Sequence, residues 1–235
     1  MSESGPEVRG EADQHDPLVA GAEAVLFDMD GVIVDSEAYW LAFEDEELFP
    51  NALAEPYPDN EEITGMNFRE IYDYLDANYE VTTTREAFVE RYHETARGIY
   101  ADDVALMPGF VDLVSTLRER GLRVGIVSSS PPEWIQVVVD RFDLGPFDVV
   151  RSADAIDGPG KPEPDVYEHA AADLDADPAR CVVVEDSATG SRAAERAGMV
   201  VVGYRTEVNA EADLPAADVV VDGPEALRTA LLDGD

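Results

Sequence analysis

Positive charge is scarce in this chain, and lysine is nearly absent. The 235 residues include 16 Lys and Arg against 52 Asp and Glu, which gives a formal net charge of −36. Lys161 is the only lysine. A surface of this charge repels nucleic acid and anionic membranes, so neither is expected as a partner. Acidic surface with almost no lysine is typical of proteins from salt-loving organisms, and we predict a halophilic protein, with a merely acidic protein of a mesophile as the alternative.

Cysteine and long apolar runs are also scarce. Cys181 is the single cysteine, so the chain cannot form an intrachain disulfide. No apolar run reaches the roughly 20 residues that span a bilayer. The N-terminal segment is acidic and lacks the basic start and apolar stretch of a secretory signal. We therefore expect a cytoplasmic protein whose residues 1–20 form a disordered acidic leader.

Short Val-rich runs alternate with segments of helical periodicity. Runs that are apolar on both faces are typical of parallel strands covered by helices. The alternation predicts a doubly wound, Rossmann-like α/β core over residues 21–35 and 106–235. The predicted strands are 24–30, 122–130, 147–153, 180–186, 199–205 and 217–223, and the predicted helices are 109–120, 133–142, 163–174, 187–197 and 224–232.

Residues 36–105 interrupt this alternation. They contain no good strand and read as three helices, at 36–48, 67–79 and 84–100, the last with Thr84 as its N-cap. An insertion of this length is too long for a loop between a strand and a helix. We predict a helical cap domain over the carboxyl ends of the strands, where open α/β sheets bind ligands.

Two acidic residues follow the first predicted strand. Side chains two apart in a strand point the same way, so Asp28 and Asp30 can reach one site, and Gly31 allows a sharp turn behind them. Two close carboxylates repel each other and need a cation or a shared proton. Taken alone, the pattern Asp-Met-Asp-Gly also fits a turn with a helix cap.

Three later patterns also stand at strand ends. Ser128 and Ser129 precede Ser130 and Pro131, and their hydroxyls and backbone N–H groups suit a phosphate oxygen. Lys161 offers a compact positive charge in the segment GKPEPD. Glu185 and Asp186 follow the apolar run CVVV. Each pattern alone also fits a helix cap or a chance placement.

Together, and in this order, the four patterns resemble the haloacid dehalogenase superfamily over residues 24 to about 205, the cap included. The resemblance implies a phosphoryl-transfer enzyme. Asp28 would be the nucleophile and become an aspartyl phosphate, and Asp30 would be the general acid and base. Ser128 and the N–H of Ser129 would hold phosphate oxygens, and Lys161 would offset charge on Asp28 and phosphate.

The resemblance also implies a Mg²⁺ cofactor, a choice that suits hard oxygen ligands. Its ligands would be the Asp28 carboxylate, the backbone carbonyl of Asp30 and Asp186, with Glu185 as an outer partner. In the cap, Asn67 and Arg69 would contact the substrate, although Arg69 fits an outward-facing helix residue equally well. The second aspartate, Asp30, argues against dehalogenation, because the dehalogenases of the superfamily lack it.

The expected activity is Mg²⁺-dependent hydrolysis of a small phosphorylated metabolite, a sugar or polyol phosphate, by a monomer or weak dimer. The run SSSP resembles sugar-phosphate phosphatases and β-phosphoglucomutase more than phosphoglycolate phosphatases, which often read Thr-Asn-Lys there. In the mutase an arginine follows Gly-x-Ser directly, whereas Arg69 stands one place later than that. A mutase and a phosphoglycolate phosphatase stay as alternatives. A receiver domain is disfavoured by its smaller size and by its lack of a cap.

Overall fold

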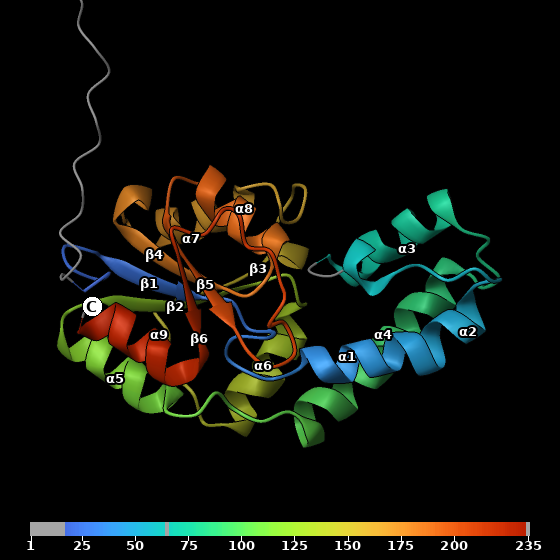
Figure 1. Ribbon diagram of the computed structural model, residues 1–235, viewed down its shortest axis with the longest axis horizontal. Coiled ribbons are helices and arrows are strands. Elements are labelled where there is room, and N and C mark those ends of the chain that lie inside the picture. The colour runs from blue at the N-terminus through green and yellow to red at the C-terminus, as the bar shows by residue number, and fades with distance from the viewer. Residues whose placement is uncertain (1–16, 64–65, 234–235) are drawn as a thin grey trace, which may run out of the picture.

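The computed structural model describes residues 17–63 and 66–233, and a six-stranded parallel sheet forms its centre (Figure 1). The strand order is β3-β2-β1-β4-β5-β6, so β1 is flanked on both sides. The strands are β1 Ala24–Phe27, β2 Arg123–Ser128, β3 Val149–Ser152, β4 Cys181–Glu185, β5 Val200–Arg205 and β6 Val219–Asp222. All six predicted strands are present, and the α/β fold is confirmed.

Helices cover both faces of the sheet (Figure 1). One face packs against α5, α6 and α9, and the other against α7 and α8. Strand side chains alternate between the two apolar cores, so Phe27 enters one core and Leu26 the other. The helices are α5 Phe110–Glu119, α6 Pro132–Arg141, α7 Asp165–Asp173, α8 Ala188–Arg196 and α9 Gly223–Leu232, with short 3₁₀ turns η4 Ala153–Ala155 and η5 Pro178–Arg180.

The chain between β1 and α5 is helical and projects from the carboxyl ends of the strands (Figure 1). Its two connections to the sheet lie side by side, because Val34 and Leu106 form an antiparallel bridge. Thr84 caps α4, as predicted, by accepting the N–H of Ala87 at 3.2 Å. The elements are α1 Glu37–Phe43, η1 Glu44–Leu48, α2 Phe49–Ala52, η2 Asn60–Glu62, α3 Phe68–Asn78, α4 Arg85–Gly98 and η3 Ile99–Asp103, of which η1 and η3 are π turns.

Residues 17–20 differ from the predicted disordered leader. Val19 is buried in the core, and the N–H of Leu18 donates to the carbonyl of Ala230 at 3.0 Å. The apolar pair Leu18 and Val19 gains more from packing beside α9 than from exposure to water, which explains the difference. The rest of that leader, residues 1–16, lies outside the described residues.

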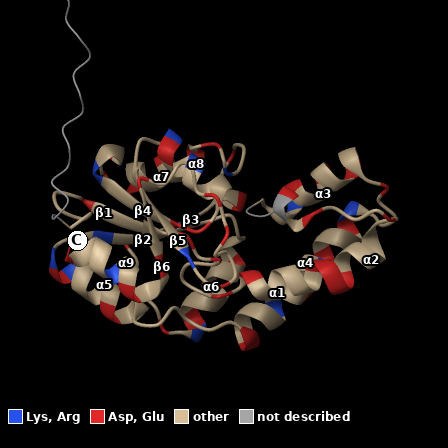
Figure 2. Cartoon of the chain, viewed as in Figure 1, with Lys and Arg blue, Asp and Glu red and all other residues tan. Residues whose placement is uncertain are grey.

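Acidic side chains are spread over the helices of both the sheet region and the insertion (Figure 2). Most of the acidic residues in the described part of the chain are exposed. The halophilic character inferred from this charge stays a prediction. Among the described residues, no helix combines the length and apolar character needed to cross a bilayer.

Candidate active site

Four of the predicted site residues converge because their strands are neighbours in the sheet. Asp28 follows β1 directly, Ser128 ends β2, and Glu185 ends β4 with Asp186 next. Strand β1 pairs with β2 on one side and with β4 on the other, so these carboxyl ends meet at one edge. Asp28, Asp30, Ser128, Ser129, Lys161 and Asp186 all line one cavity between the sheet and the helical insertion.

Lys161 lies at the centre of the buried charges. Its Nζ donates to Asp28 Oδ1 at 2.7 Å, to Glu185 Oε1 at 2.6 Å and to the carbonyl of Val127 at 3.2 Å. Burial alone would lower the pKa of Lys161, but the charges of Asp28 and Glu185 outweigh it and raise that pKa. The ammonium therefore stays charged and directs Asp28 toward the cavity.

Glu185 is held by protein donors at both of its oxygens. Oε1 accepts Lys161 and, at 2.8 Å, the hydroxyl of Tyr167, and Oε2 accepts the hydroxyl of Ser187 at 3.1 Å. A Cβ added at Gly190 would stand 1.9 Å from Glu185 Oε1, so only glycine leaves room for this carboxylate. These contacts suit a residue that positions Lys161 and supports a metal site from outside its ligand shell.

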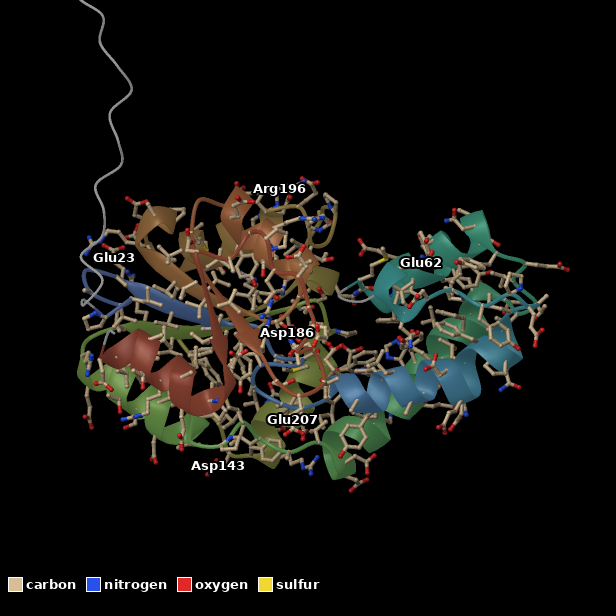
Figure 3. All side chains as sticks on the ribbon, in the orientation of Figure 1. Glu23, Glu62, Asp143, Asp186, Arg196 and Glu207 are labelled. Atoms are coloured by element: carbon tan, nitrogen blue, oxygen red, sulfur yellow. The ribbon has the colours of Figure 1, made fainter. Side chains whose placement is uncertain are left out.

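Carboxylate oxygens of Asp28, Glu185 and Asp186 lie within 4.8 Å of one another. Asp186 stands at the junction of sheet and insertion (Figure 3). Burial raises the pKa of Asp28 to about 8, despite Lys161, and burial together with Glu37 raises that of Asp186 well above its ordinary value. Three crowded carboxylates that have one ammonium among them, with the ionisation of Asp28 and Asp186 opposed by burial, are a donor set that fits a hard divalent cation.

Gly31 permits this close approach. It has a φ of +73°, and an added Cβ would stand 1.9 Å from Asp186 Oδ2. Only glycine combines that backbone conformation with the missing Cβ, so the turn after Asp30 can pass directly beside Asp186.

The two serines predicted to bind phosphate, Ser128 and Ser129, lie where β2 ends and line the cavity. Ser128 is buried, and its Oγ accepts the N–H of Ser130 at 3.0 Å. This bond turns the chain tightly between β2 and α6, so the segment from Ser128 to Ser130 faces the cavity. The arrangement offers hydroxyls beside the Asp28–Lys161 pair.

The two predicted cap contacts have different surroundings. Asn67 lines the cavity and donates through Nδ2 to the carbonyl of Ser129 at 2.9 Å. Arg69 forms an ion pair with Asp154, and its guanidinium lies 4.5 Å from the centre of the Phe68 ring. The described cavity lining does not include Arg69. The N-terminus of α3 thus links the insertion to the loops after β2 and β3.

Several cavity residues were missed by the sequence reasoning. Two acids, Glu37 and Glu44, come from α1 and η1, and an aromatic wall comes from α1, α3, α4, η3 and α6. No local pattern marks them, because their partners lie far away in the sequence. Ser130 had a signal, since it stands two places after Ser128. The aromatic wall consists of Trp40, Phe68, Tyr92, Tyr100 and Trp134.

Glu44 is buried in the insertion and accepts the hydroxyl of Tyr92 at 2.9 Å. Burial outweighs this bond and raises the pKa of Glu44 to about 7. The folded protein then holds a proton up to about pH 7 that the unfolded chain releases near pH 4.5, so the free energy of unfolding falls as pH rises through this window. The loss is on the order of 3 kcal/mol.

We expect Glu44→Gln to remove this part of the pH dependence, because Gln stays neutral. Denaturant unfolding at pH 5 and pH 8 measures the free energy of unfolding of both proteins. Relative to wild type, the variant should be more stable at pH 8 than at pH 5. Glu46→Gln, on the exposed face of η1, is the matched control and should follow wild type. Parallel curves for Glu44→Gln and wild type would contradict the assigned pKa.

Comparisons with known proteins place these features in a family. The model of haloacid dehalogenase-like hydrolases matches residues 22–198. Hexitol phosphatase B of Escherichia coli is 33% identical over 182 residues, covering 75% of this chain and 80% of that protein. A phosphorylated carbohydrates phosphatase of Thermotoga maritima is 30% identical over 214 residues, covering 89% of this chain and 98% of its own.

Among solved structures, β-phosphoglucomutase of Clostridium difficile superposes with a TM-score of 0.69 at 25% identity. The match covers 90% of this chain and 93% of the mutase. The family match spans β1 to α8 and therefore includes every strand end that contributes to the cavity. The chain belongs to the haloacid dehalogenase-like hydrolase family and is an enzyme of its phosphoric monoester hydrolase class.

Proposed function

We propose that this enzyme is a Mg²⁺-dependent phosphatase that hydrolyses a small sugar or polyol phosphate through an aspartyl phosphate on Asp28. The observation that carries the proposal is the buried pair of Asp28 and Lys161 facing one cavity together with Asp186. The ammonium holds Asp28 Oδ1 at 2.7 Å, which leaves Oδ2 as the oxygen to attack phosphorus.

The other residues have complementary roles in this proposal. Asp30 gives a proton to the departing alkoxide and later takes one from the water that attacks the aspartyl phosphate. Ser128 and Ser129 bind phosphate oxygens. Mg²⁺, held by Asp28, Asp186 and the backbone carbonyl of Asp30, supplies positive charge that lets an anionic nucleophile approach an anionic phosphate.

The chemistry of the cavity favours a neutral polyhydroxyl group beyond the phosphate. Glu37 and Glu44 can accept hydrogen bonds from hydroxyls, and Trp40 and Trp134 offer apolar ring faces. Among the described lining residues Lys161 is the single cation, and it is bound to Asp28 and Glu185. A second phosphate or a carboxylate would enter a buried space where no free cation among the described lining residues could receive it.

The size of the cavity supports a small substrate. Its volume is about 110 Å³, below the roughly 300–1,000 Å³ of common ligand pockets. The two phosphatases that resemble the chain act on hexitol phosphates and phosphorylated carbohydrates, as their names state. Both names agree with a polyhydroxyl substrate.

The alternatives fit these groups less well. A β-phosphoglucomutase must hold a bisphosphate, and a phosphoglycolate phosphatase must hold a carboxylate next to the phosphate. The ion pair of Arg69 with Asp154 removes the cap cation that either activity would use. Mutase activity stays the second candidate because a β-phosphoglucomutase shares the fold.

A panel of phosphorylated metabolites tests the proposal. With Mg²⁺ and high salt, we expect sorbitol 6-phosphate or a hexose phosphate to release phosphate at least about tenfold faster, as kcat/KM, than phosphoglycolate or fructose 1,6-bisphosphate, since one misplaced charge costs more than about 1.4 kcal/mol. Preference for a bisphosphate or for phosphoglycolate would contradict the substrate class. Conversion of β-glucose 1-phosphate into glucose 6-phosphate without phosphate release would favour the mutase.

A further inference from the structure

The carboxylate of Asp30 accepts three hydroxyl groups from three separate parts of the chain. Ser36 Oγ donates to Oδ1 at 2.5 Å, and Ser130 Oγ donates to Oδ2 at 2.7 Å. The third donor is Tyr100, whose hydroxyl reaches Oδ1 at 2.6 Å. Ser36 precedes α1, Ser130 follows β2, and Tyr100 lies in η3, where the insertion returns to the sheet.

Tyr100 is itself held firmly. It is 1% exposed, and its ring packs against those of Trp40 and Trp134 at centroid distances of 6.0 and 5.8 Å. The indole Nε1–H of Trp40 donates to the Tyr100 hydroxyl at 3.2 Å. Because an indole N–H can only donate, the phenol oxygen accepts there, and its own hydrogen is directed to Asp30.

A tyrosine hydroxyl carries its hydrogen at neutral pH, so the phenol of Tyr100 has one hydrogen to donate. Ser130 Oγ lies 3.3 Å from the phenol oxygen but already donates to Asp30. The hydrogen-bonded chain from Trp40 through Tyr100 to Asp30 therefore has one consistent direction.

We propose that Tyr100 is a positioning residue that fixes the Asp30 carboxyl group for proton transfer to the leaving oxygen. The proposal rests on the proposed function, in which Asp30 is the general acid. General acids act only within hydrogen-bond reach of the atom that they protonate, so a carboxyl group free to rotate loses efficiency. Since Tyr100 belongs to the insertion, seating of the insertion on the sheet region also completes the proton donor.

Leaving-group dependence separates this role from simple packing. An alkoxide leaves poorly without a proton, whereas p-nitrophenolate leaves well without one. We expect Tyr100→Phe, which keeps the ring, to lower kcat/KM for the best alkyl phosphate of the panel by roughly 10- to 100-fold, a part of the 10²–10⁴-fold that general acids contribute. For p-nitrophenyl phosphate we expect a change below about threefold.

Two further variants complete the test. Trp40→Phe removes the donor that orients the phenol and keeps the proposal testable if Tyr100→Phe fails to fold. Because Trp40 also lines the cavity, the readout for this variant is kcat under saturation and not KM, and kcat for the alkyl phosphate should fall selectively but to a smaller extent. Tyr79→Phe removes a hydroxyl bound to Glu62 in the insertion and should leave both substrates unaffected.

Asp30→Asn separates the two proposals. The measured quantity is kcat/KM, which reports the steps up to the aspartyl phosphate and not its hydrolysis, where Asp30 acts on both substrates alike. If Asp30→Asn lowers kcat/KM equally for both substrates, the general acid role of Asp30 fails, and with it that part of the proposed function. A second outcome concerns Tyr100 alone. Suppose that Asp30→Asn lowers kcat/KM selectively for the alkyl phosphate, whereas Tyr100→Phe and Trp40→Phe slow both substrates equally or slow neither. Then only the positioning role of Tyr100 is overturned.

Discussion

Asp28→Asn should lower phosphate release by about 10⁴-fold or more, because the amide cannot attack phosphorus. The other carboxylate beside Lys161, Glu185, is already bound by Tyr167 and Ser187 and does not line the cavity. The substitution keeps the size of the side chain, and an amide oxygen can still accept the Lys161 ammonium. The loss should therefore appear in kcat while the circular dichroism spectrum stays that of wild type. Phosphate release from the best panel substrate measures it.

Acid-quenched wild type should also carry the mass of one phosphoryl group after brief exposure to substrate, and Asp28→Asn should not. Asp112→Asn is the matched control, since Asp112 lies exposed on α5 away from the cavity. An Asp28→Asn enzyme that retained activity, or that still gained the phosphoryl mass, would refute Asp28 as the nucleophile.

Removal of divalent metal should have the second largest effect. With excess EDTA we expect activity to fall by about 10³-fold, since the metal stabilises charge worth several kcal/mol in phosphoryl transfer. Mg²⁺ should also raise the melting temperature of wild type, because it binds the folded state and relieves repulsion among Asp28, Glu185 and Asp186.

Asp186→Asn gives this prediction a second readout. In EDTA the variant should melt above wild type, because it removes one of the buried carboxylates whose ionisation is already opposed. In Mg²⁺ the order should reverse, because the variant loses a ligand and with it the metal-induced shift. If Mg²⁺ raised the melting temperature of Asp186→Asn as much as that of wild type, the assignment of Asp186 as a ligand would be contradicted.

The sheet and its strand ends were predictable because their signals are local. A run such as CVVVED indicates a buried strand and the acids that follow it. The parallel arrangement of the strands then brings their carboxyl ends together at one edge of the sheet. Lys161 was recognisable as the single lysine of an otherwise Arg-using chain. None of these inferences needed knowledge of how the insertion packs.

The insertion side of the cavity could not be predicted in the same way. Tyr100 is 70 residues from Asp30, and Glu44 is 48 residues from Tyr92, so no spacing in the sequence connects either pair. Arg69 is the converse case. Its position suggested a substrate contact or an outward-facing residue, but its guanidinium is paired with Asp154, which is 85 residues away. Helical periodicity shows which face of a helix is buried, yet not which distant groups meet that face.

The position of the single lysine has a practical consequence for handling the protein. Lys161 is 5% exposed and bound to two carboxylates. Reagents that acylate or reductively alkylate amines therefore find no accessible lysine amine on the described part of the folded chain. Modification of Lys161 itself would then require that the cavity has opened, so its reaction with an amine reagent measures local or global unfolding around this site.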